Sequence, residues 1–134
     1  MSSRCHTVRA VLASAVVLAT SAIALAGGTT TKLIARMPSF AGVRAKAVYV
    51  EVQRDDGGLR QQLSIEVEKA QPGESFDVFV DGAFITTLTA NGLGIAEVEL
   101  DAGDDEPGQT TLPRIGTGDT VQVGTLNGVF MPRR

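Results

Sequence analysis

Four carboxylates in the C-terminal third of the chain are the residues best suited to bind a metal ion. They are Asp101, Asp104, Asp105 and Glu106. Calcium takes roughly six to eight oxygen ligands, and clustered carboxylates on a loop supply such ligands. The spacing does not follow the alternating ligand series of an EF-hand loop with its distal Glu. The run therefore predicts a solvated acidic turn, with a weak, irregular calcium or small-ligand site as the alternative, and we expect no cofactor.

A separate pair of carboxylates raises the question of acid–base catalysis. Glu97 and Glu99 are two residues apart in a predicted strand, so their side chains share a face at about 7 Å. Glycoside hydrolysis uses two carboxyl groups separated by about 5–9 Å. Any polar strand face has this spacing, however, and an open sheet surface does not desolvate a carboxyl group to raise its pKa. We therefore expect no enzymatic activity.

The third candidate is an aromatic pair. A tight turn at Asp81-Gly82 makes Phe79 and Phe84 cross-strand neighbours on an otherwise polar face. An exposed aromatic pair flanked by Asp77 and Glu99 predicts a surface that binds a partner. The alternative, which the sequence favours because monomeric proteins rarely leave such a pair bare, is that the long acidic loop or a terminal strand covers the pair.

Tight turns also predict the strands that position these residues. Val, Ile, Phe and Thr recur with a period of two, which is typical of half-buried strands. Asp81-Gly82 and Asn91-Gly92 are both two-residue type I′ hairpin signals. Together they predict a three-strand antiparallel meander over Ser75–Leu100. Its predicted pairs are Val80–Ala83, Val78–Ile85, Phe76–Thr87, Ala83–Leu100, Ile85–Val98 and Thr87–Ala96.

A further hairpin is predicted upstream of the meander. A four-residue loop over Asp55–Gly58 would pair Val50 with Leu63 and Val48 with Ile65, which places apolar residues on one face. The segment Gln71-Pro72-Gly73-Glu74 would then turn the chain into the meander, because Pro favours turns through its fixed φ.

The two ends of the chain are predicted to complete the sheets. Thr31–Arg36 and Thr120–Val123 are expected strands, Pro38–Gly42 a connection, Asp101–Gly118 a long loop, and Asn127-Gly128 a last hairpin. The total is about eight strands without a convincing helix. One-sided apolar sheets must pack on another layer. The chain is therefore predicted to be all-β, a small antiparallel sandwich or partly closed barrel.

The N-terminal segment is typical of a secretory signal peptide. Arg4, His6 and Arg9 precede an uncharged apolar run from Ala10, and Ala24-Leu25-Ala26 ends it as an A-x-A cleavage signal. We expect residues 1–26 to be removed, leaving residues 27–134 as a single domain that is periplasmic or secreted and has no membrane span. The apolar run is also short for a span, which needs about 20 residues.

The remaining composition narrows the function classes. Cys and His each occur once, within the leader, and the chain has no Trp. The processed chain would therefore lack disulfides, Cys/His metal sites and Cys or His nucleophiles. It would carry ten Lys and Arg against fifteen Asp and Glu, a formal charge of −5, which argues against a nucleic-acid partner. Few Pro or Lys residues protect the strand edges, which leaves self-association open.

Several segments resemble short β-domains of exported bacterial proteins of uncharacterised function. The resemblance covers about Ser64–Phe130. It is carried by Phe76–Gly82, Thr89–Gly94, Ala96–Asp101, Gly118–Val123 and Gly128–Phe130. It implies a secreted or envelope-associated β-module without known catalytic residues. The predicted role is therefore a non-enzymatic structural or interaction module whose partner is a protein or an envelope component.

Overall fold

The structure, a computed structural model, describes residues 28–103 and 111–133. The predicted signal peptide and three residues of the acidic run, Asp104, Asp105 and Glu106, lie outside this part of the chain. The described residues form strands and no helix. The strands are β1 (Thr29–Phe40), β2 (Val43–Gln53), β3 (Leu59–Glu68), β4 (Ser75–Val80), β5 (Ala83–Thr89), β6 (Ala96–Gly103), β7 (Thr120–Val123), β8 (Leu126–Val129) and β9 (Met131–Pro132).

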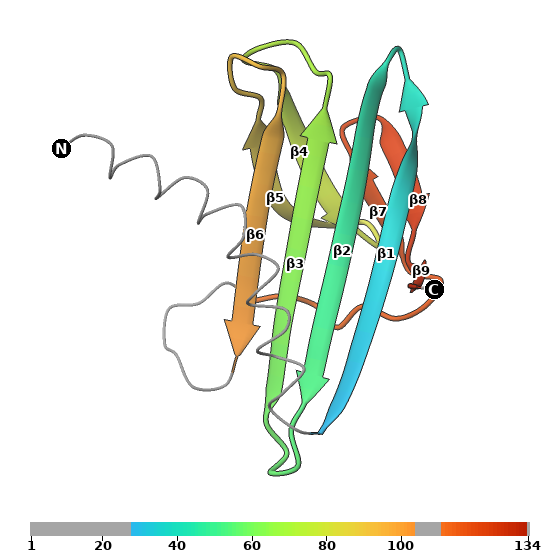
Figure 1. Cartoon of the computed structure of the whole chain (residues 1–134), viewed down its shortest axis with the longest axis vertical. Coiled ribbons are helices and arrows are strands. Elements are labelled where there is room, and N and C mark those ends of the chain that lie inside the picture. Colours follow the sequence, from blue (N-terminus) through green and yellow to red (C-terminus); the bar gives the residue numbers. More distant parts are fainter. Residues whose placement is uncertain (1–27, 104–110, 134) are drawn as a thin grey trace, which may run out of the picture.

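The strands form two antiparallel sheets that face each other (Figure 1). The five-stranded sheet has the order β6-β3-β2-β1-β9, and the four-stranded sheet has the order β5-β4-β7-β8. The predicted all-β sandwich is confirmed, with nine strands described where about eight were expected, and the two sheets do not close into a barrel. Within the described ranges, no helical segment has the length and apolar character needed to cross a membrane.

The first hairpin begins later than the sequence predicts. β1 runs through Pro38 to Phe40, and the turn into β2 is Ala41-Gly42, with φ of 54° and 87°. The predicted connection over Pro38–Gly42 is therefore too long, since only Ala41-Gly42 forms the turn. The register between β1 and β2 shifts between Met37 and Phe40. A proline has no N–H to donate to the ladder, and it is tolerated in a strand at such an irregularity.

The register of the second hairpin differs from the predicted one by a single residue. Tyr49 pairs with Leu63, and Ala47 pairs with Ile65, so the predicted partners Val50 and Val48 are wrong. The loop has five residues, 54–58, and the Arg54 N–H donates to the Gly58 carbonyl at 2.8 Å. A one-residue shift turns every side chain to the other face.

As a result, three valines of β2, Val48, Val50 and Val52, lie on the outer face of the five-stranded sheet. Val50 and Val52 are buried there and form a small cluster with Val48, separate from the main core. Tyr49 and Glu51 face the other sheet instead. Both faces of β2 carry apolar residues, so the hydrophobic pattern of the strand alone does not select one register.

The hairpin between β4 and β5 is confirmed at its turn. Asp81 and Gly82 have φ of 48° and 83°, Val80 pairs with Ala83, and Phe79 pairs with Phe84. Beyond this point the register shifts by one residue, which is a β-bulge. Val78 pairs with Thr86 and Phe76 pairs with Leu88, so the predicted partners Ile85 and Thr87 are wrong.

The bulge has a simple physical reason. Ile85 and Leu88 are three residues apart, so a regular strand would turn one of them away from the core. The extra residue allows Leu88 to reach the core, where it is buried, while Ile85 stays half-buried against it. The gain from burying a leucine, about 1.5–3 kcal/mol, favours the irregular register.

The predicted meander does not continue beyond β5. β6 pairs with β3, with Val98 opposite Ile65 and Leu100 opposite Leu63, and so belongs to the five-stranded sheet. The chain therefore crosses between the sheets at Asn91-Gly92 instead of forming a hairpin there. All predicted pairs between β5 and β6 are wrong, although Val98 still packs against the core.

The C-terminal strands are only partly as predicted. β7 has the expected bounds, but the turn after it is Gly124-Thr125, and Asn127-Gly128 lies inside β8. Gly124 has φ of 61°, and its N–H donates to the Asp77 carbonyl at 2.9 Å. This bond ties the turn to the neighbouring strand β4. The chain then returns to the other sheet, where β9 pairs with β1.

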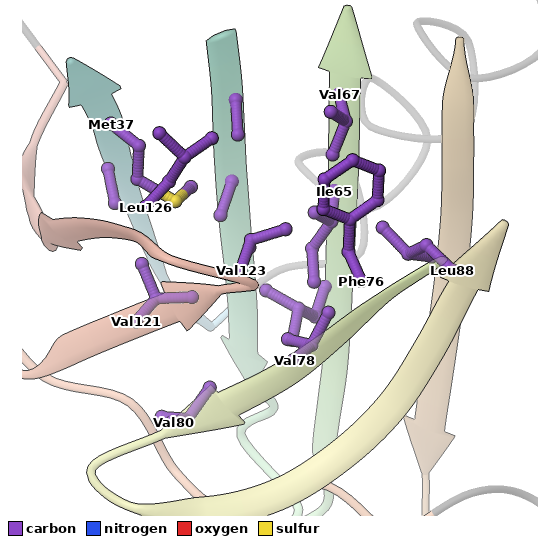
Figure 2. Packing of buried hydrophobic residues seen from close by; sticks show 14 of the residues in the cluster. Met37, Ile65, Val67, Phe76, Val78, Val80, Leu88, Val121, Val123 and Leu126 are labelled. Carbon is purple, nitrogen blue, oxygen red and sulfur yellow. The ribbon is translucent and has the colours of Figure 1, made fainter. Parts of the chain in front are cut away.

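The core fills the space between the two sheets (Figure 2). In the figure, Phe76 and Leu88 from the four-stranded sheet point toward Ile65 of β3, and Leu126 of β8 lies beside Met37 of β1. All five side chains are buried. Apolar burial of this kind is the main source of stability here, since the only Cys lies outside the described residues.

Candidate functional site

The aromatic pair lies on the outer face of the four-stranded sheet. Phe79 follows and precedes the buried residues Val78 and Val80 of β4, so strand alternation directs it away from the core. The rings of Phe79 and Phe84 meet edge to face, with centroids 5.7 Å apart and planes at 71°. Phe84 is 58% exposed. The prediction of a cross-strand pair is confirmed.

Polar side chains surround this pair on the same face. The ladder places Gln122 of β7 beside Phe79, and Asn127 of β8 follows in the same row. Their amide groups donate to turn carbonyls, Gln122 to Gly124 at 3.0 Å and Asn127 to Thr125 at 3.3 Å. The neighbouring row is also polar, since the Thr87 hydroxyl donates to Asp77 at 2.8 Å.

The structure brings together three of the four residues predicted for the binding surface. Phe79, Phe84 and Asp77 share one face, which we call the aromatic face. Glu99 does not belong to it, because β6 lies in the other sheet, where Glu99 is exposed opposite Ser64. The expectation of its proximity followed from the meander, which is wrong.

The predicted cover for the aromatic pair is not found among the described residues. The terminal strand β9 lies in the five-stranded sheet, and Phe84 is accessible over more than half of its surface. A cross-strand aromatic pair adds up to about 1 kcal/mol to a sheet. Among the described residues, Phe84 is the aromatic member of four exposed large apolar side chains, the others being Leu93, Val129 and Met131.

The carboxylates considered for metal binding are described only in part. Asp101 lies on β6 opposite Gln62 and is half-buried. Its Oδ1 atom is buried and accepts no hydrogen bond from the described residues. Within residues 28–103 and 111–133, no three His, Cys, Asp or Glu side chains are arranged to hold a metal ion. The calcium hypothesis thus stays a prediction about residues outside this part.

The pair considered for catalysis lies on an open surface. Glu97 and Glu99 are both exposed on the outer face of the five-stranded sheet, and Glu97 is opposite Glu66 of β3. A general acid is usually prepared by removing its carboxyl group from water. The surroundings of Glu97 and Glu99 do not do this, because both residues are exposed.

A buried polar network between the sheets was not foreseen from the sequence. The Tyr49 hydroxyl donates to Glu51 Oε2 at 2.7 Å. The Gln61 amide donates to the Tyr49 oxygen and to the Pro113 carbonyl, both at 3.0 Å. Tyr49, Glu51 and Gln61 are each at most 8% exposed. The network therefore joins β2 and β3 to the connection that precedes β7.

Arg114, on that connection, completes the network. Its Nε donates to Glu51 Oε2 at 3.0 Å, and its Nη2 donates to Glu51 Oε1 at 2.6 Å. Two parallel bonds between a guanidinium and a carboxylate are among the stronger polar contacts in proteins. The Arg114 side chain is 60% exposed, while that of Glu51 is 10% exposed. The pair thus lies at the boundary between the core and solvent.

The network fixes the protonation states of its members. Hydrogen bonds from Arg114 hold the pKa of Glu51 below its ordinary value, against the opposing effect of burial. Burial, followed by the hydrogen bond to Glu51, raises the pKa of Tyr49 to about 12. At neutral pH the carboxylate is charged and the phenol is neutral, so this pair does not exchange a proton. Its role is to hold the connection over residues 111–119 against the sheet.

One sequence signal pointed to this network. Glu51 is the only charged residue within Val48–Val52, an otherwise apolar run, and a buried carboxylate requires a partner. The partner, Arg114, is 63 residues away in an irregular segment. No periodicity connects the two positions.

Comparisons with known proteins add no further assignment. No family model matches the chain, and neither the curated proteins nor the solved structures include a significant match.

Proposed function

We propose that this protein is an exported, non-enzymatic β-sandwich that binds a protein or another component of the cell envelope through its aromatic face. The observation that carries the proposal is the exposure of Phe84 beside Phe79 on a folded sheet. Aromatic side chains, Phe among them, are enriched in protein interfaces relative to the rest of the surface.

The polar surroundings of the pair support a binding role. The hydroxyl of Thr87 and the carboxylate of Asp77 are already hydrogen-bonded to each other, so the face is ordered before a partner arrives. A pre-ordered surface loses less conformational entropy on binding. The rim of a typical interface is polar in the same way.

A non-enzymatic role is supported by the state of the polar groups. The most strongly perturbed groups, Glu51 and Tyr49, hold each other and Arg114 in a closed network. A catalytic acid or base needs a pKa near the working pH, and the pKa of Tyr49 is about 12. The export proposal is supported by the charged, apolar and A-x-A segments of residues 1–26.

Site-specific photocrosslinking in the native host tests the binding proposal. A benzophenone amino acid replaces Phe84 in one variant and Leu93 in a control. Leu93 is even more exposed, at 83%, but it lies in the crossing between β5 and β6. We expect a discrete adduct from position 84 and none from position 93. The same adduct from both positions, or none from position 84, would overturn the aromatic face as the binding site.

A second variant separates binding from folding. Phe84→Ser should lower the free energy of unfolding by at most about 1 kcal/mol, because only the cross-strand pair is lost. When added in excess, the unlabelled wild type should suppress the adduct formed by the benzophenone variant, and Phe84→Ser should not. Mass spectrometry of the protein recovered outside the cytoplasm tests export, with Gly27 expected as the first residue. An intact leader on cytoplasmic protein would contradict the export proposal.

A further inference from the structure

The edges of the two sheets differ in their protection against pairing with another strand. β9 has two residues, one of them Pro132. β8 has four residues and lies against β1, where a Cβ on Gly128 would meet the Met37 side chain. β6 has eight residues, but three of them are Glu97, Glu99 and Asp101. Short length, proline and charge are the usual means of protecting an edge.

The fourth edge, β5, has none of these features. It is seven residues long, Ala83–Thr89, and contains no charged residue, proline or glycine. Four of its residues are β-branched, a composition that favours strands. Within the described part of the chain, β5 pairs only with β4, so no strand is hydrogen-bonded to its other side, although β6 of the facing sheet lies near it. Four of its side chains are exposed and only one is buried.

We propose that β5 pairs antiparallel with β5 of a second copy of this chain, about a two-fold axis at Thr87. A strand edge is complementary to its own antiparallel copy, so the contact is isologous and closes as a dimer. The two four-stranded sheets become one eight-stranded sheet. Two aromatic faces then lie side by side on the same surface. The proposal does not depend on the proposed binding partner.

The bulge determines where the axis lies. The ladder between β4 and β5 is irregular at Ile85 and regular over Thr86–Thr89, so the regular part offers the straight edge. Pairing about Thr87 places Thr86 opposite Leu88 of the other copy, and both side chains then face inward. An axis at Leu88 would shorten the paired segment, and an axis at Thr86 would draw the residues before the bulge into the new ladder. Odd registers place inward side chains against outward ones.

Charge distinguishes this edge from its neighbour β6. Pairing two β6 strands would bring Glu97, Glu99 and Asp101 against their copies about 5 Å apart, where like charges repel. In the β5 dimer, the nearest acidic residue on the aromatic face is Asp77, one strand further in. Two copies of Asp77 would be three strand spacings apart, about 14 Å, which exceeds the Debye length of about 8 Å at physiological salt.

Sedimentation equilibrium of the protein, expressed with its own leader, tests the dimer. We expect a reversible dimer for the wild type and at least about 10-fold weaker association for Thr87→Lys, which places two ammonium groups at the axis. The control is Thr125→Lys, which adds the same charge to an exposed turn of the same sheet. A monomeric wild type, or equal association of the two variants, would overturn the proposal.

Disulfide trapping tests the register independently. In a Cys5→Ser background, Thr87→Cys should oxidise to a covalent dimer, because residues opposite each other on an antiparallel axis have Cα atoms within disulfide range. Glu99→Cys on β6 serves as the exposed control and should remain monomeric. Equal crosslinking of both variants would refute the Thr87 axis.

Discussion

Two turns of the same type in the sequence have different roles in the fold. Asp81-Gly82 and Asn91-Gly92 are ten residues apart and are both favourable hairpin dipeptides. Asp81 and Gly82 both have positive φ and join β4 to its neighbour β5 within one sheet. Neither Asn91 nor Gly92 has positive φ, and the chain there passes from one sheet to the other.

The difference follows from what each turn contacts. Asn91 Oδ1 accepts hydrogen bonds from the N–H groups of Leu93 at 2.8 Å and Ile95 at 3.1 Å. The positive φ falls instead at Gly94, whose carbonyl accepts the Ala70 N–H at 2.9 Å. The crossing is therefore held by a side chain and by a distant backbone segment. A dipeptide signal identifies a reversal of the chain, while long-range contacts decide which sheet receives the next strand.

Gly94→Ala is expected to have the largest effect of the turn substitutions. Gly94 has φ of 77°, and a Cβ there would overlap the carbonyl oxygen of Ala70. Backbone strain and the displaced segment together should lower the free energy of unfolding by about 3 kcal/mol or more. Chemical denaturation of the variant measures this loss. A loss below about 1 kcal/mol would show that the crossing is not anchored at Ala70.

The connection that precedes β7, over residues 111–119, is held by an ion pair and should respond to pH. Glu51→Gln removes the carboxylate that Arg114 binds and should cost about 2 kcal/mol at neutral pH. Because the folded pKa of Glu51 is below its ordinary value of 4.5, its contribution is complete above that pH. The contribution disappears as pH falls through the folded pKa. The stability difference between wild type and variant should therefore shrink in acid.

The phenol of the same network gives the opposite pH dependence. The pKa of Tyr49 is raised from 10.0 to about 12, so its contribution is complete below pH 10 and is lost between pH 10 and 12.

Glu68→Gln is the matched control for Glu51→Gln, since the ion pair of Glu68 with Arg44 is exposed. It should change stability by less than about 1 kcal/mol. Equal effects at Glu68 and Glu51 would contradict a special role for the buried network.

Local patterns predicted the features that depend on neighbours in the sequence. The turn at Asp81-Gly82 was sufficient to pair Phe79 with Phe84, and β7 has its predicted bounds. The predictions failed where two distant segments decide the outcome. The register of β2 was ambiguous because both of its faces are mostly apolar, and the observed register has a five-residue loop closed by the hydrogen bond from Arg54 to Gly58.

The candidate sites also divide into those set by nearby residues in the sequence and those set by distant segments. The aromatic face was predicted for Phe79, Phe84 and Asp77, which lie within eight residues of each other. Glu99 was assigned to it only through the incorrect meander. The network of Glu51 and Arg114 was not predicted because its members meet through tertiary structure alone.

Asn91→Ala tests the side chain that organises the crossing. The substitution removes the acceptor for the N–H groups of Leu93 and Ile95. An unsatisfied backbone donor costs about 1–3 kcal/mol when buried, and less when water can replace the partner. Since this loop is largely exposed, we expect a loss of about 1.5 kcal/mol in denaturant unfolding. Asn91→Asp keeps an acceptor oxygen and should recover most of that loss.

Gly82→Ala tests the hairpin that the sequence predicted correctly. Gly82 has φ of 83°, but a Cβ there would meet no atom within 4 Å. The cost is therefore the conformational strain of a left-handed alanine alone, about 1 kcal/mol. Thermal unfolding of this variant should place it between Gly94→Ala and the wild type. A cost equal to that of Gly94→Ala would show that steric overlap adds nothing at the crossing.

Gly92→Ala should have the smallest effect and separates the two turns most directly. In a type I′ hairpin, Gly92 would need positive φ, and alanine would cost about 1 kcal/mol. In the observed crossing its φ is not positive, and a Cβ would meet no atom within 4 Å. Alanine then restricts only the unfolded chain, so stability should stay the same or rise by about 0.5 kcal/mol. If Gly92→Ala and Gly82→Ala lower the free energy of unfolding equally when measured side by side, Gly92 must have positive φ. The segment Asn91-Gly92 would then form a hairpin and not a crossing between the sheets.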